Sequence, residues 1–467
     1  MPETVSLREW ERIGPGDERY GARLRDFRFA GEGERALARQ LTESQTLELM
    51  EMHDGLHVRA RSHVGRVRVG ALTITVQPKI GTQELLALFR YAYGFRHTRW
   101  MDVSDYSTTG AMFGDLLIAQ LCAEVRELLE RGIARAYVRT DEDLSAPRGR
   151  IAFDDLARRG GVSRAELPCA HHPRSTDHLL NQVLVSGLAL AMAMVSDRRL
   201  RASVARLHAT ASTLARPVVL SARLLDRAER RIDRLVEPYR AVVDLIGLLY
   251  FGTLLDLDDE SADRRLPGFL FDMNSLWQRL LERFLRENLD GYTVEREHGL
   301  TSLMRYAKDH NPRGRKSPRP RPDYAIRMGE RVVTLLDAKY RDLWEHSLPK
   351  DMLYQLAVYA LSQPRGSTAA ILYPTTDPGA RSARIEICDP TSGAASAYVA
   401  LRPVRLAGLV DLLADSGARR ERTRYARELA LGDASVARAP ADARGSSGNS
   451  AAPRSGKSAA PGRKERG

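Results

Sequence analysis

Residues 322–339 read PDYAIRMGERVVTLLDAK, and this stretch decides how the C-terminal half of the chain folds. Asp323–Arg327 and Arg331–Leu336 are strand patterns, and Met328-Gly329-Glu330 between them is typical of a turn. The second run is the pattern of a strand buried inside a sheet. We therefore expect a hairpin whose second strand belongs to the core and ends in charged residues.

Three charged side chains gather where these two strands meet. Residues i and i+2 of a strand point to the same face, so Asp337 and Lys339 project together. Asp323 begins the neighbouring strand and can approach the same point. Carboxylate oxygens suit Mg²⁺, which keeps water and substrate phosphate in its remaining positions. A lysine beside the ion can position the attacking water or stabilise charge on phosphate oxygens. The pattern predicts Asp323 and Asp337 as metal ligands and Lys339 as the catalytic cation.

The alternative is a surface hairpin with an ordinary salt bridge, because an Asp-x-Lys triplet arises by chance about once in a chain of this kind. Lysine usage favours the catalytic interpretation. Of the 72 basic residues only seven are lysine, and the rest are arginine. Arginine cannot replace a compact ammonium group at a catalytic centre, so a lysine kept at the end of an apolar strand is informative.

The elements around this hairpin complete a compact α/β unit, which we assign to residues 268–415. Helical or strand patterns are found at Met273–Asn288 (helix), Tyr292–Glu295 (strand), Lys350–Ser362 (helix) and Thr368–Tyr373 (strand). A charged break at residues 256–266 is interpreted as the linker that enters this unit.

The helix predicted at Lys350–Ser362 carries Gln355 and Tyr359 at positions i and i+4, on one face. An amide and a phenol one turn apart suit contacts to a DNA phosphate or to a metal-bound water, so both are predicted as supporting catalytic residues. Taken alone, these two residues would be better interpreted as polar residues on a solvated helix face.

A basic loop leads directly into Asp323. Positive charge there would hold the DNA backbone against the site, and the alternative is a solvated flexible loop. The candidate DNA-binding residues are Arg313, Arg315, Lys316, Arg319 and Arg321.

The rest of the chain divides into a β-containing N-terminal region, residues 1–140, a mostly helical middle, residues 141–255, and a basic tail, residues 438–467, whose composition is typical of disorder. The fold class is thus α/β multidomain. The predicted strands are Val58–Ala60, Val64–Val69, Leu72–Val76 and Ile133–Val138; the predicted helices are Leu85–Tyr93, Phe113–Leu129, Asp177–Val195, Leu200–Leu214 and Leu220–Leu235. Residues 1–45 show no clear pattern.

Bulk properties narrow the classes of function. A net charge of +12 and a pI near 9.7 favour a polyanionic partner, although the basic tail contributes to both. No apolar run is long enough for a membrane helix, and no signal peptide is evident, so we expect a cytoplasmic protein. Three widely spaced cysteines, with His171, His172 and His178, match no zinc pattern.

These residues together resemble the McrC subunit of McrBC methylcytosine-dependent restriction systems, within the PD-(D/E)xK nuclease superfamily. The resemblance covers roughly residues 58–405. Its nuclease motifs recur across that superfamily, whereas the Pro-Lys segment and the Met-Asn helix point to McrC in particular. The matching segments are Val69–Ile74, Gln77–Ile80, Arg148–Ile151, Asp177 with Asn181, Asp272–Asn274, Pro322-Asp323, Asp337–Tyr340 and Tyr354-Gln355 with Tyr359.

The resemblance implies a restriction-endonuclease-like core with Mg²⁺ as cofactor and double-stranded, methylated DNA as substrate. It also implies a partner, a McrB-like AAA+ GTPase, whose ring receives the N-terminal region and is stimulated by it. The chain has no phosphate-binding loop of its own. One position departs from the family: a glutamate that supports the metal is replaced by Gln278, and Glu282, one turn further on, is a possible substitute.

Two other interpretations stay open. The chain could be a PD-(D/E)xK nuclease that works without a GTPase. It could also be a non-enzymatic activator whose nuclease site has decayed, with Gln278 as the mark of decay. Intact Asp323, Asp337 and Lys339 argue against decay, because drift should remove these residues first.

Overall fold

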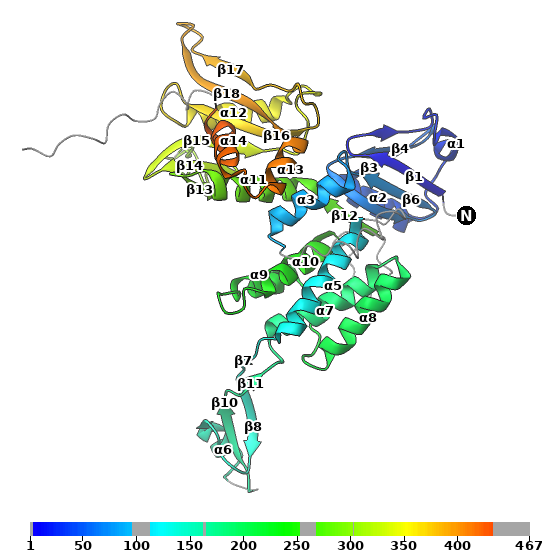
Figure 1. Ribbon diagram of the computed structural model, residues 1–467, viewed down its shortest axis with the longest axis vertical. Helices are drawn as coiled ribbons and strands as arrows, with labels where there is room; N and C mark the ends of the chain where they lie inside the picture. Colours follow the sequence, from blue (N-terminus) through cyan, green and yellow to red (C-terminus); the bar gives the residue numbers. More distant parts are fainter. Residues whose placement is uncertain (1–2, 96–112, 162–164, 253–267, 302, 433–467) are drawn as a thin grey trace, which may run out of the picture.

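The computed structural model describes residues 3–95, 113–161, 165–252, 268–301 and 303–432. It consists of an N-terminal pair of sheets and a C-terminal six-stranded sheet side by side, a helical body below them and a narrow arm (Figure 1). The predicted linker at 256–266 and the predicted tail at 438–467 lie outside the described residues. No helix within the described ranges is long and apolar enough to cross a membrane.

The N-terminal region contains two sheets around their own apolar core. Three of its strands confirm the predicted pattern, and helix α3 (Thr82–Tyr93) confirms the predicted helix. Residues 1–45, which gave no clear pattern, contain a strand that pairs in parallel with β6 and an amphipathic helix. The elements are β1 (Glu3–Arg8), β2 (Arg12–Ile13), α1 (Gly21–Leu24), α2 (Glu32–Glu43), β3 (Leu47–Met52), β4 (Gly55–Ala60), β5 (His63–Val69) and β6 (Leu72–Gln77).

The helical body follows. Its helices are α5 (Phe113–Arg131), α7 (Leu179–Met194), α8 (Arg198–Ser212), α9 (Ala222–Arg230) and α10 (Tyr239–Gly252). Four of these were predicted from their apolar periodicity. The buried helix α7 is apolar on nearly all sides, as expected for a helix at the centre of a bundle.

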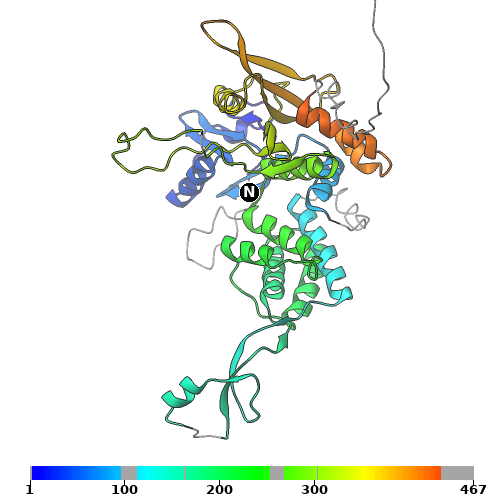
Figure 2. The ribbon, with the colours of Figure 1, turned by 90° about the vertical axis from the view of Figure 1, so that its left-hand side faces the viewer.

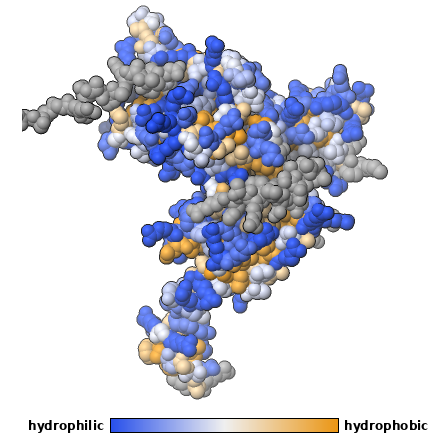
Figure 3. Space-filling view, in the orientation of Figure 1, coloured by the Kyte–Doolittle hydropathy of each residue, from blue (hydrophilic) through white to orange (hydrophobic). Residues whose placement is uncertain are grey.

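The described residues of 136–175 form the arm, which consists mainly of short strands although most of it falls in the region predicted to be mostly helical, 141–255. A two-stranded neck leads to a three-stranded sheet with one short helix, far from both large sheets (Figures 1 and 2). Only two residues of the strand predicted at Ile133–Val138 are in a strand, where they pair with the returning chain. The elements are β7 (Ala136–Tyr137), β8 (Thr140–Leu144), β9 (Arg150–Ile151), α6 (Phe153–Arg158), β10 (Leu167–His171) and β11 (Arg174–Ser175). The face in Figure 3 is mostly hydrophilic, with apolar patches on the upper part of the molecule, on the helical body and on the arm.

The C-terminal sheet has the strand order β13-β14-β15-β16-β18-β17. β14 and β15 form the predicted antiparallel hairpin, and β15, β16 and β18 run parallel, so their carboxyl ends share one edge. Helix α11 begins and ends at the predicted residues. The elements are α11 (Met273–Asn288), β13 (Thr293–Arg296), β14 (Tyr324–Met328), β15 (Arg331–Ala338), α12 (Lys350–Leu361), β16 (Thr368–Thr375), β17 (Ala383–Cys388), β18 (Ala395–Arg405), α13 (Leu406–Ala414) and α14 (Arg419–Leu431).

One strand of the N-terminal sheet comes from the C-terminal part of the chain. β12 (Gly268–Asp272) directly precedes α11 in the chain, yet it pairs antiparallel with β5 of the N-terminal sheet. Helix α3 in turn packs against α11, and a single apolar cluster extends through the helical body, α3, α11 and the C-terminal sheet. The C-terminal unit and the N-terminal region therefore share an extensive interface.

Candidate active site

The hairpin brings Asp323 to the end of β15. Tyr324 pairs with Leu336, so Asp323 lies one position beyond the paired segment and faces the residues that follow Leu336. The backbone N–H of Ala338 donates a hydrogen bond of 2.7 Å to Asp323 Oδ2. This bond holds the first acid against the end of β15, which carries the second acid and directly precedes the lysine.

Asp337 is almost fully buried, with 2% of its surface exposed. Lys339 Nζ lies 3.0 Å from its Oδ2 atom. The other oxygen, Oδ1, is buried and has no hydrogen-bond partner among the described residues. Burial, together with the negative charge of Asp323, raises the pKa of Asp337 to about 6, although Lys339 acts in the opposite direction. An unsatisfied buried carboxylate oxygen is costly in free energy, so a carboxylate that keeps one is a candidate metal ligand.

Lys339 is fixed by its backbone as well as by its charge. Its N–H donates to the carbonyl of Leu372 on β16 at 3.1 Å, which continues the parallel pairing beyond the strand end. Burial lowers the pKa of the ammonium group, but the charges of Asp337 and Asp323 outweigh this and raise the pKa. Lys339 therefore stays protonated beside the two acids.

Helix α11 contributes Gln278, at the position where the resemblance expects an acid. Gln278 Nε2 donates to Asp323 Oδ1 at 3.1 Å. The Tyr324 hydroxyl donates to the backbone carbonyl of Gln278 at 2.5 Å. The proposed substitute, Glu282, instead lies near two arginines, with N–O distances of 3.3 Å to Arg286 and 3.6 Å to Arg296. Of these two α11 residues, Gln278 is the one in contact with an acid of the site.

Gln355 and Tyr359 lie on one face of α12, as predicted, and contact each other. Gln355 donates to the Tyr359 hydroxyl at 2.7 Å, and that hydroxyl donates to the carbonyl of Arg321 at 2.9 Å. Tyr359 is 1% exposed, and burial raises its pKa to about 12, so the phenol stays protonated. The pair thus holds the backbone immediately before Pro322-Asp323.

The basic loop lies between β13 and β14. Figure 2 shows this segment extending away from the sheet. All five predicted DNA-binding side chains are exposed. A turn orders part of it, because Asn311 accepts from the Arg315 N–H at 2.9 Å and donates to its carbonyl at 2.8 Å. The end of the loop is fixed near the site by the Tyr359 bond to Arg321.

The donor set suits a hard cation. Two carboxylates, one of them with a free buried oxygen, approach each other at the end of the sheet, and Mg²⁺ is commonly bound by one or two carboxylates plus water. Within the described ranges, no group of three or more His, Cys, Asp or Glu side chains converges, so water and substrate would have to fill most positions around a bound ion. His171 pairs with Glu142, and His178 contacts the carbonyl of Ala134.

Sequence reasoning missed the backbone groups that order the site. The N–H of Ala338 and the carbonyl of Leu372 carry no side-chain signal. The indole of Trp277 also donates to the Leu372 carbonyl at 3.1 Å. An indole buried on the apolar face of α11 usually needs an acceptor, which is the one signal that the sequence offered.

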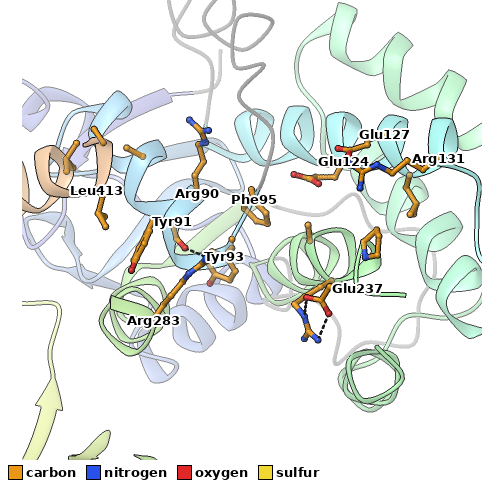
Figure 4. A pocket seen from close by; sticks show the side chains of 18 residues that line it. Arg90, Tyr91, Tyr93, Phe95, Glu124, Glu127, Arg131, Glu237, Arg283 and Leu413 are labelled. Carbon is orange, nitrogen blue, oxygen red and sulfur yellow. Dashed lines mark hydrogen bonds and ion pairs between the residues drawn. The ribbon is translucent and has the colours of Figure 1, made fainter. Parts of the chain in front are cut away.

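A large cavity lies elsewhere in the molecule. It measures about 780 Å³ and lies among α3, α5, α10, α11 and α13. Figure 4 shows Arg283 reaching the carbonyl of Tyr91 at its wall, and the structure places its guanidinium 5.1 Å from the Tyr91 ring centre. None of the predicted site residues lines it.

Comparison with known proteins agrees with this architecture. A chain of the Thermococcus gammatolerans assembly of McrB AAA+ hexamers with bound McrC matches with a TM-score of 0.52 and 19% identity, over 90% of this chain and 98% of that chain. The cryo-EM structure of the McrBC complex from the same organism matches with a TM-score of 0.41 and 19% identity, over 62% and 89%. No curated protein matches. The family model of the McrBC 5-methylcytosine restriction system component matches residues 58–374, more than half of the sequence, so the chain belongs to this family.

Proposed function

We propose that this chain is the Mg²⁺-dependent endonuclease subunit of a modification-dependent restriction system and that it hydrolyses phosphodiester bonds of double-stranded DNA in the cytoplasm. The observation that carries the proposal is the buried Oδ1 of Asp337, which has no partner among the described residues and lies beside a second carboxylate and a lysine. A purely structural acid at this depth would have both oxygens satisfied.

Asp323 and Asp337 would hold the ion, which when bound polarises the scissile phosphate and lowers the pKa of a water molecule. Lys339 is 3.0 Å from Asp337 and protonated, so its ammonium group can bind phosphate oxygens as their charge increases. Gln278 donates to Asp323 and so holds that carboxylate in one orientation. Gln355 and Tyr359 fix the backbone before Asp323, which limits the motion of the first acid.

The exposed loop of residues 311–321 supports a DNA substrate, because its basic side chains lie on the segment that enters the site. The net charge of +12 agrees with a polyanionic partner. Methylated DNA is favoured over unmodified DNA because the family model describes a 5-methylcytosine restriction system component.

A McrB-like AAA+ GTPase is the proposed partner, stimulated by this chain. The Thermococcus gammatolerans structure contains McrB AAA+ hexamers with bound McrC, and its matched chain is covered almost completely by this one. The predicted partner-docking region, residues 1–140, would then present its sheets to the ring while the C-terminal sheet acts on DNA.

The rival function is a non-enzymatic activator, and Gln278 is the observation in its favour. Gln278 adds no negative charge to the site, so metal binding would be weaker than with a third acid. A nuclease that acts alone is the other rival, and the family match counts against it.

The test is cleavage of modified and unmodified plasmid with Mg²⁺, GTP and the McrB-like GTPase of the same organism. Wild type and Asp337→Ala are compared, and GTP hydrolysis is measured in the same samples. We expect only the wild type to cut, and both proteins to stimulate hydrolysis. Stimulation without cleavage by either protein would establish the activator instead. Cleavage by the wild type at an equal rate without the GTPase would establish the solitary nuclease.

A further inference from the structure

The segment directly after β15, which carries Lys339, also contacts the N-terminal region. Tyr340, the next residue, donates from its hydroxyl to Glu9 Oε2 at 3.1 Å. Glu9 follows β1 directly, and its N–H continues the pairing of β1 with β6 by donating to the Gln77 carbonyl at 3.1 Å. Two residues distant by more than 300 positions thus meet next to the active site.

Burial of the Glu9 carboxyl group at this position is unfavourable in free energy. It is 2% exposed, and its Oε1 atom is buried without a hydrogen-bond partner among the described residues. Burial raises its pKa to about 7, while the Lys79 N–H, the Tyr340 hydroxyl and the Lys79 charge act in the opposite direction. A buried carboxyl with one unsatisfied oxygen lowers stability, so its presence points to a role other than stability.

The Pro78-Lys79 segment, which resembled McrC in the sequence, completes the arrangement. The Lys79 N–H donates to the same Glu9 oxygen at 3.1 Å, so one atom binds both the turn after β6 and Tyr340. Lys79 Nζ is also 3.9 Å from Glu345.

Tyr340 connects this contact to both sides of the active site. Along the chain it follows Lys339 directly. Its ring packs edge-on against Trp277, with ring centres 6.3 Å apart. The Trp277 indole donates to the Leu372 carbonyl, and the same carbonyl also accepts a hydrogen bond from the Lys339 N–H. Trp277 directly precedes Gln278, which donates to Asp323. A shift of Tyr340 would therefore move the lysine and the amide together.

A neighbouring contact repeats the connection. The Arg341 guanidinium lies 5.7 Å from the centre of the Trp10 ring. Trp10 has a φ of 66°, a left-handed conformation that costs a bulky residue energy unless the surroundings impose it. This backbone places Glu9 and Trp10 together against the segment that follows β15.

We propose that Glu9 is a positioning residue of the nuclease, which fixes Tyr340 and thereby the placement of Lys339 and Gln278 relative to the N-terminal sheet. The proposal rests on the proposed nuclease function. Its consequence is that a displacement of the N-terminal region, such as a docked partner would produce, changes the geometry of the active site.

The test uses the full chain with Tyr340→Phe, which removes one hydroxyl and keeps the ring against Trp277, together with Glu9→Ala and Glu9→Gln. Glu51→Gln is the matched control, because Glu51 pairs with Arg35 at 3.2 Å inside the N-terminal region and belongs to neither contact. Hydrogen–deuterium exchange of the peptide 336–343 is measured, with plasmid cleavage, DNA KM and GTP hydrolysis.

We expect faster exchange in this peptide for Tyr340→Phe and Glu9→Ala, with kcat for cleavage lower by about tenfold and KM unchanged, since small misplacements near reacting groups have effects of this size or more. Glu9→Gln keeps an acceptor oxygen, so its exchange rate in this peptide and its kcat should stay close to those of wild type. Exchange equal to wild type in Glu9→Ala and Tyr340→Phe would overturn the proposal whether or not the protein cuts. Unchanged kcat despite faster exchange would overturn it as well. Absence of cleavage by the wild type would instead refute the nuclease function, and exchange would still decide the contact.

Discussion

The side chains of Asp337 and Asp244 are each almost completely covered and lie beside a cation, and burial raises the pKa of both. Asp337 is 3.0 Å from Lys339 at the end of β15, and Asp244 on α10 is 2.6 Å from Arg279 on α11. Burial is the main cause of a pKa raised to about 6 in both. By titration alone, either one would be a candidate for the active site.

The surroundings separate them. The Arg279 guanidinium that meets Asp244 also lies 4.6 Å from the centre of the Tyr93 ring, so this pair joins α10, α11 and α3. Asp337 instead keeps one oxygen free of partners among the described residues and has a second carboxylate beside it. A raised pKa thus reports burial, whereas a buried unpaired oxygen beside a second acid indicates a site for a cation.

The cation beside each acid should respond differently to substitution. Lys339→Arg keeps the charge but cannot place a compact ammonium group at 3.0 Å from Asp337, so we expect cleavage to fall about a hundredfold. Arg279→Lys should leave the cleavage rate within about twofold at a temperature where the variant is folded. Plasmid cleavage rates measure both, and equal losses in the two variants would erase the distinction between the regions.

Mg²⁺ should stabilise the protein through Asp337 and not through Asp244. A ligand at a hundred times its Kd stabilises the native state by about 2.7 kcal/mol. We expect Mg²⁺ to raise the Tm of wild type and of Asp244→Asn, EDTA to reverse the rise, and Asp337→Asn to lose it. Calorimetric melting measures the effect. A rise in Asp337→Asn as large as in wild type would place the cation elsewhere.

Asp244→Ala should affect stability alone. Breaking a fully buried ion pair costs about 3–5 kcal/mol, but the Arg279 side chain is 34% exposed, so we expect about 1–3 kcal/mol. Asp337→Asn, measured without metal, should have unchanged or higher stability, because it removes a buried charge. Urea unfolding measures the change in the free energy of unfolding of each variant. A large loss of stability in Asp337→Asn would contradict the view of Asp337 as functional.

The two acids should make the metal-free protein less stable as the pH rises. Each folded-state pKa is about 6, above the ordinary value of 3.8, so the native state holds more protons than the unfolded state between these values. Stability should therefore decrease from about pH 4 to pH 6, and each Asp→Asn variant should flatten the decrease by up to ~1.4 kcal/mol per pH unit. With Mg²⁺ present, the Asp337 contribution should disappear, since the ion holds the ionised form. Thermal melting at a series of pH values, in buffers of equal ionic strength, measures this dependence of stability on pH.

The smallest effect should come from the loop before Asp323. The double variant Arg315→Ala/Lys316→Ala should weaken DNA binding severalfold and lower the slope of log K against log[salt] by roughly 2, as expected for two lost phosphate contacts. Arg198→Ala/Arg199→Ala, at an exposed end of α8, is the matched control. Equal slopes in the two double variants would show that the loop does not contact DNA.

The sequence predicted the arrangement of strands and charged residues at the end of β15, because local patterns encode it. The two strand patterns and the turn within residues 323–336 predicted the hairpin, and the i, i+2 spacing predicted that Asp337 and Lys339 lie together. Apolar periodicity gave α11 to the residue. Long-range pairing was not encoded locally: β12 joins the sheet of β5, and β1 inserts in parallel beside β6.

The remaining contacts could not be predicted from the sequence, for physical reasons. The Ala338 N–H and the Leu372 carbonyl act through the backbone, which every residue possesses. Glu9 gave no signal because a single acid after a short strand is normally exposed, and only the tertiary packing buries it. The arm at residues 136–175 has short polar strands that no periodicity identifies.

Cleavage of methylated plasmid by wild type, Asp337→Asn and Asp244→Asn tests the account most directly, with Mg²⁺, GTP and the partner GTPase present and at a temperature where all three are folded. We predict cutting by wild type and Asp244→Asn, and none by Asp337→Asn, which should still stimulate GTP hydrolysis. Cutting by Asp337→Asn at the rate of wild type would contradict the assignment of the β15 edge as the nuclease centre.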